Sequence, residues 1–160
     1  MRTLNEFVLA DLIASRAESR PDLDVVTFEG GGVRDDEIRT YADLWANANR
    51  IAAGLIARGL NYGDRFALLM RNHPEFIETM IAASLTGTVF VPIDPRTKGA
   101  KLSYTLNNSG CRGIICADYS LEQVAAIREQ VPSLEWIWVL ESGDEPGVMP
   151  TSDVVIAEPM

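Results

Sequence analysis

The chain has 160 residues, of which 47% are hydrophobic and 23% are charged. These proportions are typical of a folded protein of about one domain and exclude a disordered or collagen-like chain. With 14 Lys and Arg against 23 Asp and Glu the formal charge is -9, and the basic residues are scattered, so we expect no nucleic-acid partner.

The N-terminal part of the sequence predicts a helix followed by a β-hairpin. Thr3-Leu-Asn-Glu6 has the form of a capping box, and a helix is expected from there to about Arg20, where the following proline ends it. Two β-rich segments, Val25–Phe28 and Glu37–Thr40, flank the polar turn Gly30–Asp36. Neither a Lys-Ser/Thr pair nor a helix follows the three glycines of this turn, so a hairpin turn is favoured over a phosphate loop.

The second predicted helix is the clearest element of the sequence. Its apolar residues recur at steps of three and four, which is the spacing of one buried helix face. They are Tyr41, Leu44, Trp45, Ala48, Ile51, Ala52, Leu55 and Ile56. Thr40 is placed to cap this helix together with Asp43, and Gly59 supplies the left-handed residue that commonly ends a helix.

Further along the chain, apolar runs alternate with predicted helices. The runs, which begin about 23 residues apart, are Phe66–Met70, Val89–Ile93, Gly113–Ala117 and Trp136–Leu140. The helices expected between them are Pro74–Leu85, a shorter one at Lys101–Asn107, and Leu121–Gln130, which Ser120 caps together with Gln123. This alternation predicts an α/β fold: a largely parallel sheet with helices on both faces, plus the N-terminal hairpin.

Residues 1–140 are therefore expected to form one α/β unit, and residues 141–160 a linker or tail. The longest nearly uncharged stretch, Thr79–Ile93, is too short for a membrane span, and the N-terminus lacks the apolar core of a signal peptide. Cys111 and Cys116 fit neither a Cys-x-x-Cys motif nor an obvious disulfide framework. We therefore expect a cytoplasmic protein with two reduced structural thiols.

Few residues in the sequence suggest catalysis. His73, the single histidine, directly precedes Pro74, so it is expected to be an N-terminal cap or a surface residue. One His and two poorly spaced Cys do not make a zinc ligand set, so no metal site is expected. Asp35 and Asp36 lie in the glycine-rich turn and are expected to be solvated. No catalytic residue is therefore assigned.

The end of the predicted strand Val89–Ile93 is the one place where the sequence suggests a ligand. Asp94 and Arg96 follow it, at the carboxyl edge where open α/β sheets bind ligands, and Arg96 is suited to hold a phosphate. Residue chemistry alone favours the alternative, in which Asp94 caps the following turn and Arg96 points into water, because turn residues of this kind are common.

Three segments, in this order and at these separations, resemble the adenylate-forming ligases, which include acyl-CoA synthetases, luciferases and peptide-synthetase adenylation domains. They are Arg39-Thr-Tyr-Ala-Asp-Leu44 with its helix ending at Gly59, Gly63-Asp-Arg-Phe-Ala-Leu-Leu-Met-Arg-Asn-His-Pro-Glu-Phe76, and Ser84-Leu-Thr-Gly-Thr-Val-Phe-Val-Pro-Ile-Asp-Pro95. The resemblance covers roughly residues 4 to 140 and implies the N-terminal portion of an enzyme that activates a carboxylate with ATP and Mg²⁺ and passes the acyl group to coenzyme A (CoA).

Within that family, Pro95-Arg-Thr-Lys98 is more similar to the CoA ligases than to the peptide synthetases. The resemblance implies that Arg96 lies near the CoA phosphates. The segment Val25–Tyr41 resembles crotonobetaine/carnitine-CoA ligases and their fatty-acid relatives. The expected partners are the remainder of the ligase polypeptide and a small carboxylic acid substrate.

The sequence departs from the family where the chemistry is concentrated. It does not contain the phosphate-binding loop Thr/Ser-Ser-Gly-Thr-Thr-Gly-x-Pro-Lys, the later ATP and ribose motifs, or the C-terminal lysine. We therefore expect the chain alone to be inactive, because nothing in it neutralises charge on the transferring phosphoryl group. Two alternatives stay open: a non-catalytic CoA- or nucleotide-binding module, and an interaction domain with an open sheet edge.

Overall fold

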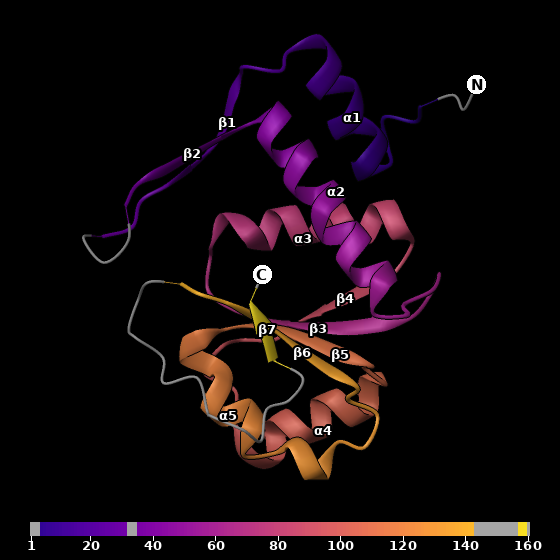
Figure 1. Cartoon of the computed structure of the whole chain (residues 1–160), viewed down its shortest axis with the longest axis vertical. Helices are drawn as coiled ribbons and strands as arrows, with labels where there is room; N and C mark the ends of the chain where they lie inside the picture. Colours follow the sequence, from indigo (N-terminus) through magenta and orange to yellow (C-terminus); the bar gives the residue numbers. More distant parts are fainter. Residues whose placement is uncertain (1–3, 32–34, 143–156, 160) are drawn as a thin grey trace. The chain divides into compact units, whose positions relative to one another are not determined.

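A computed structural model describes residues 4–31, 35–142 and 157–159 (Figure 1). The chain forms two compact units. The helical unit consists of Met1–Gly63 and His73–Thr88, and the sheet unit consists of Asp64–Asn72 and Val89–Met160. The α/β class, the parallel sheet and the antiparallel hairpin predicted from the sequence are confirmed.

The helical unit packs three helices together and carries the hairpin. Its elements are α1 (Leu9–Ser19), β1 (Asp24–Phe28), β2 (Glu37–Thr40), α2 (Tyr41–Ala57) and α3 (Pro74–Thr86). The strands β1 and β2 pair antiparallel, as the sequence predicts. The core of this unit contains apolar side chains from all three helices, namely Ile13, Leu44, Ala48 and Ile81.

The helix α2 agrees closely with the helix predicted from the sequence. Thr40 Oγ1 accepts a hydrogen bond from the Asp43 amide (3.2 Å), and the Asp43 carboxylate accepts one from the Thr40 amide (2.9 Å), which confirms the capping box. The bond from the Thr40 amide, together with one from the Thr40 hydroxyl to the same carboxylate (2.8 Å), lowers the pKa of Asp43. Gly59 has a φ of 78°, the left-handed conformation expected of it. The prediction for Ile56 is wrong, since its side chain is 61% exposed.

The start of α1 differs from the sequence prediction. The helix begins at Leu9 after Val8, which makes no side-chain capping bond. Thr3 lies outside the described residues. The physical reason for the late start is a local turn: Asn5 Oδ1 accepts a hydrogen bond from the Phe7 amide (3.0 Å), and the Asn5 amide donates to Asp11 Oδ2 (3.0 Å).

The sheet unit is built on a five-stranded parallel sheet of order β4-β3-β5-β6-β7. The strands are β3 (Arg65–Leu69), β4 (Val89–Pro92), β5 (Gly113–Ala117), β6 (Trp136–Leu140) and β7 (Ala157–Pro159). The predicted strands at 113–117 and 136–140 are reproduced residue for residue. The strand β7 lies in the segment predicted as a linker or tail, most of which is outside the described residues, so that prediction stays open.

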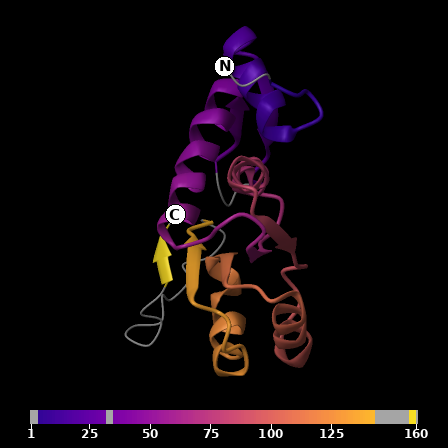
Figure 2. The same cartoon turned by 90° about the vertical axis from the view of Figure 1, so that its right-hand side faces the viewer.

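Two helices cover one face of this sheet. In Figures 1 and 2, α4 (Gly99–Ser109) and α5 (Leu121–Ala125) lie on the same side of the strands. The core between them and the sheet contains Ala67, Leu69, Leu102, Leu106, Ile114, Cys116, Val124, Ile137 and Val139. Side chains of the opposite face, such as Phe66 and Ile115, are also fully buried. The central strands are therefore buried on both faces, as their continuous apolar runs predict.

The prediction of a capped helix over 121–130 is wrong in two respects. The helix α5 ends at Ala125, and a separate 3₁₀ turn, η2, covers Arg128–Gln130. Ser120 makes no capping bond, because its backbone (φ -103°, ψ -5°) is already helical within the 3₁₀ turn η1 (Asp118–Ser120), whereas a capping residue is extended. Gln123 forms a different contact, described below.

The remaining single-residue predictions have clear outcomes. His73 occupies the capping position of α3, but the alternative that it is a surface residue is wrong, since it is 4% exposed and its ring lies 5.6 Å from that of Phe28. Cys111 and Cys116 are free and buried, as expected. Across the described parts of the chain, no helix is both long and apolar enough to cross a membrane.

Candidate functional site

The carboxyl edge of the sheet brings together residues from separate βα units. Because β3 pairs with both β4 and β5 in parallel register, the segments that follow these three strands lie side by side. Arg71 follows β3, Asp94 and Arg96 follow β4, and Tyr119 follows β5. This is the edge at which the sequence suggests a ligand as one of two interpretations.

The turn after β4 holds Arg96 through Asp94. The amide of Thr97 donates to the Asp94 carbonyl (2.8 Å), which closes a four-residue turn, and the Arg96 amide donates to Asp94 Oδ1 (2.9 Å). The Arg96 guanidinium also contacts this carboxylate, with Nε 3.0 Å from Oδ1 and Nη2 2.6 Å from Oδ2. Hydrogen bonds from the Arg96 side chain and amide hold the pKa of Asp94 well below its usual range.

Arg96 is open to solvent despite this pairing. Its side chain is 89% exposed and that of Asp94 is 47% exposed. The position of Asp94 at the turn and the exposure of Arg96 agree with the structural alternative raised from the sequence. Because exposed ion pairs are weak, another anion can replace the Asp94 carboxylate on Arg96.

A cavity of about 410 Å³ lies in the sheet unit directly after this turn. It lies between the start of α4 and the η1–α5 segment, and its lining residues are Lys98, Gly99, Tyr119, Glu122, Gln123 and Ala126. This volume is in the range of small-molecule pockets, which are about 300–1,000 Å³. Lys98 supplies a cation, Glu122 a carboxylate and Tyr119 an aromatic surface, so the lining offers one charge of each sign and a ring on which a ligand can stack.

Two further contacts fix the walls of the cavity. The Tyr119 hydroxyl accepts a hydrogen bond from the Arg71 amide (2.6 Å), and the Arg71 guanidinium lies 4.7 Å from the centre of the Tyr119 ring. Gln123 Nε2 donates to the Pro95 carbonyl (2.7 Å). The sequence did not predict either contact, because each joins residues from different βα units.

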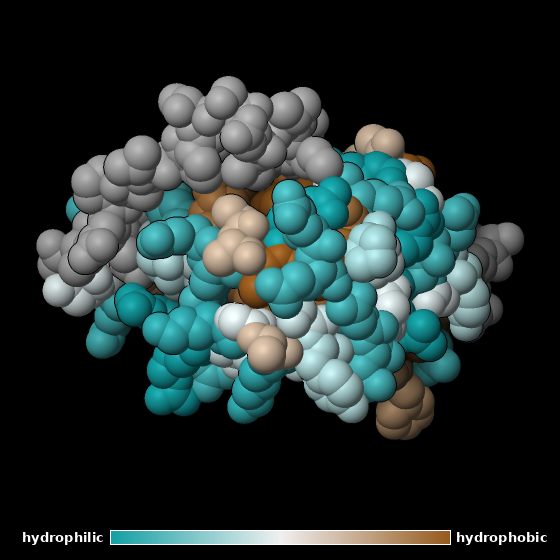
Figure 3. Space-filling model, turned by 90° about the horizontal axis from the view of Figure 1, so that it is seen from below, coloured by the Kyte–Doolittle hydropathy of each residue, from teal (hydrophilic) through white to brown (hydrophobic). Residues whose placement is uncertain are grey.

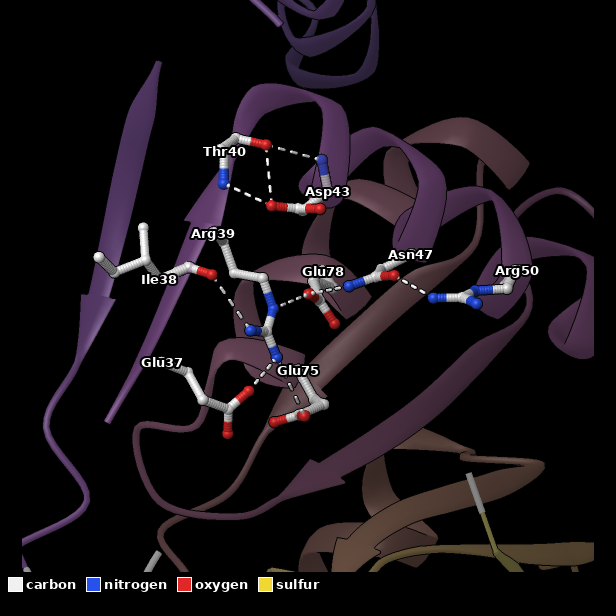
Figure 4. A network of polar contacts seen from close by, with 9 residues as sticks. All are labelled: Glu37, Ile38, Arg39, Thr40, Asp43, Asn47, Arg50, Glu75 and Glu78. Atoms are coloured by element: carbon white, nitrogen blue, oxygen red, sulfur yellow. Dashed lines mark hydrogen bonds and ion pairs between the residues drawn. The ribbon is translucent and has the colours of Figure 1, made fainter. Parts of the chain in front are cut away.

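The helical unit contains a buried polar network that the sequence did not predict (Figure 4). Glu78 of α3 is 2% exposed and accepts hydrogen bonds from Arg39 Nε (2.9 Å) and Asn47 Nδ2 (2.6 Å). Arg39 also contacts Glu37 (2.5 Å) and Glu75 (3.8 Å). The available signal for such a network was Glu78 itself, which lies between the apolar pairs 76/77 and 80/81 of α3.

Burial acts unequally on the two central charges of this network. It raises the pKa of Glu78, although Asn47 and Arg39 partly oppose that shift. Burial alone would lower the pKa of Arg39, but its bonds to Glu37 and Glu78 outweigh this effect and raise the pKa. Through Arg39, Asn47 and Glu78 the network holds β2 against α2 and α3 rather than forming an acid–base couple.

In the described part of the chain, no three His, Cys, Asp or Glu side chains gather as metal ligands. Arg96 and Lys98 place two cations within three residues at the carboxyl edge of the sheet, which suits an anionic group. The face shown in Figure 3 is mainly hydrophilic, with apolar side chains only in small separate groups.

A family model described as AMP-binding enzyme matches residues 13–157. A feruloyl-CoA synthase from Amycolatopsis sp is 41% identical over 88 residues, which make up 55% of this chain and 18% of that protein. The long-chain-fatty-acid–CoA ligase FadD13 of Mycobacterium tuberculosis is 37% identical over 119 residues, or 74% of this chain and 23% of the relative. The chain thus spans about a fifth of the length of these relatives.

Solved structures agree with these relatives. A structure described as a long-chain-fatty-acid CoA ligase from Rhodopseudomonas palustris superposes with a TM-score of 0.76 at 25% identity, covering 87% of this chain and 34% of the other. The anthranilate CoA ligase AuaEII, solved with anthranoyl-AMP, gives a TM-score of 0.76 at 20% identity, which bears on the fold alone.

Proposed function

Because the chain belongs to the AMP-binding enzyme family, we propose that it forms the N-terminal portion of an ATP-dependent acyl-CoA ligase, which converts a carboxylate, ATP and CoA to acyl-CoA, AMP and diphosphate. The observation that carries this proposal is the family match over 13–157, supported by relatives that are CoA ligases. The small carboxylic acid substrate and the cytoplasmic location belong to the same proposal.

In such a ligase, this chain and the remainder of the polypeptide would bind different substrates. Arg96 would hold a CoA phosphate by exchanging the Asp94 carboxylate for a phosphate oxygen, and Lys98 would add a second cation at the cavity. The other part of the polypeptide would bind ATP and Mg²⁺, whose role is to neutralise charge on the transferring phosphoryl group. The chain alone would then catalyse neither half-reaction.

Complementation tests this proposal. The chain is mixed with a polypeptide that carries the phosphate-binding loop and the C-terminal domain, and pyrophosphate release is followed across a panel of acids that includes ferulate and long-chain fatty acids. We expect acid-dependent release from the mixture and none from either part. If no acid in the panel gives pyrophosphate release although gel filtration confirms a complex, the proposal is contradicted.

A second candidate function is a CoA-binding module without chemistry. It is favoured by one observation: Arg96, Lys98 and the whole cavity lie within the sheet unit of this chain. Calorimetry with CoA and with ATP on the chain alone tests it. Binding of CoA without complementation in the pyrophosphate assay would favour the module over the ligase portion.

A further inference from the structure

The turn that carries Arg96 is attached to the next βα unit by one side chain. Within the turn, the amides of Arg96 and Thr97 both bond to Asp94. The carbonyl of Pro95, in the middle of the turn, accepts a hydrogen bond from Gln123 Nε2 at 2.7 Å. Gln123 is 28 residues further along the chain, in α5.

The same glutamine also lines the cavity. Its side chain is partly buried, and it faces the cavity together with Lys98 and Gly99 at the start of α4. One amide group therefore contacts the turn that presents Arg96 and also forms part of the cavity wall. This hydrogen bond links the turn to the wall of the cavity.

We propose that Gln123 is a positioning residue for CoA: by holding the Pro95 carbonyl, it keeps the turn that carries Arg96 attached to the wall of the cavity. This inference rests on the proposed function, in which Arg96 contacts a CoA phosphate. The contact requires a neutral donor of this length. A glutamate would direct a lone pair at the carbonyl and place a negative charge beside the phosphate, and a methionine would fill the same volume without donating.

The decisive variant is Gln123→Met, measured by calorimetry with CoA on the 160-residue chain. We expect CoA to bind between about twofold and tenfold more weakly, which corresponds to the net contribution of one neutral hydrogen bond. The matched control is Gln130→Met, the same change at an exposed position of η2, for which no change is expected.

A double-mutant cycle with Arg96→Ala separates positioning from a direct or merely structural role. If Gln123 acts through Arg96, Gln123→Met has no further effect on CoA binding once Arg96 is replaced. A full, additive loss in the Arg96→Ala background would overturn the inference, since it would mean that Gln123 contacts the ligand itself or only stabilises α5.

Amide hydrogen exchange tests the positioning step without a ligand. Gln123→Met should accelerate exchange of the Arg96 and Thr97 amides severalfold, because their turn loses its attachment, while amides of β5 keep their protection. Unchanged exchange in the turn would overturn the inference even if CoA binds through Arg96. Absence of CoA binding by the unmodified chain, or binding that Arg96→Ala leaves intact, would instead refute the proposed CoA contact.

Discussion

The Arg96 guanidinium is bound to the Asp94 carboxylate in this structure, through both Nε and Nη2. Asp94 therefore has two effects on any phosphate ligand. Its backbone and side-chain oxygens accept the hydrogen bonds that shape the turn, which favours ligand binding. Its negative charge pairs with the guanidinium, and a phosphate must compete with that pairing to bind. Because the pKa of Asp94 is held well below its usual range, mild acidification does not release Arg96.

Asp94→Asn separates these two effects. The amide oxygen can still accept from the Arg96 backbone, but the charge is gone, so we expect CoA to bind roughly twofold to fivefold more tightly, the scale of an exposed ion pair. Calorimetry measures this change. The control is Asp22→Asn, an exposed aspartate of the helical unit that changes the net charge equally. Weaker binding of the Asp94 variant would mean that the carboxylate orients Arg96 rather than competing for it.

At the scale of elements, the buried network joins β2, α2 and α3 through Glu78. Burial raises the pKa of Glu78 above its ordinary value of 4.5. A group whose pKa is raised by folding stabilises the fold fully at pH values below its unfolded pKa, and this contribution is lost as the pH rises through the folded pKa. The ionised glutamate is thus less favourable to the fold than the protonated one.

The variant Glu78→Gln tests whether ionisation of Glu78 lowers the stability of the fold. The free energy of unfolding of the parent chain, measured by urea titration from pH 4 to pH 8, should fall relative to that of the variant as the pH rises. Glu75→Gln, one turn earlier in α3 and 3.8 Å from Arg39, is the matched control for the loss of one carboxylate beside Arg39. A parent chain that gains stability relative to Glu78→Gln on raising the pH would show that the ion pair with Arg39 outweighs burial.

Elements were predictable where local pattern and tertiary burial agree. Continuous apolar runs located β5 and β6, and the Thr40–Asp43 pair located the start of α2, because each depends on neighbours in sequence. The end of α5 was not predictable, since the backbone leaves the helical region at the buried Ile127, where tertiary packing overrides helix propensity.

The site was predictable only in part, for a related reason. The strand end and the residue types placed Arg96 at the carboxyl edge of the sheet. The Gln123–Pro95 contact spans 28 residues and the Arg39–Glu78 contact spans 39, and no periodicity or short motif encodes such pairs. Gln123 in particular was interpreted as part of a capping box, a local role for a side chain that in fact makes a long-range contact.

At the scale of the whole molecule, the two cysteines report on folding. Cys111 and Cys116 are both fully buried, and burial, with a further contribution from Asp118, raises the pKa of Cys116 to about 12. We expect both thiols of the native chain to react with Ellman's reagent at pH 8 roughly a hundredfold or more slower than in guanidinium. Rapid reaction of either thiol in native buffer would show that the sheet unit opens readily.

The turn after β4 has a thermodynamic consequence as well as a structural one. The ring of Pro95 fixes one backbone angle, and hydrogen bonds with Asp94, Thr97 and Gln123 restrain the rest of the turn. The turn therefore loses little conformational entropy when a ligand binds. Capture of a phosphate by Arg96 is then an exchange of one oxyanion for another on a preorganised scaffold. Such an exchange conserves the number of charge-assisted bonds, so its enthalpy should be small and selectivity among anions should depend on charge and shape.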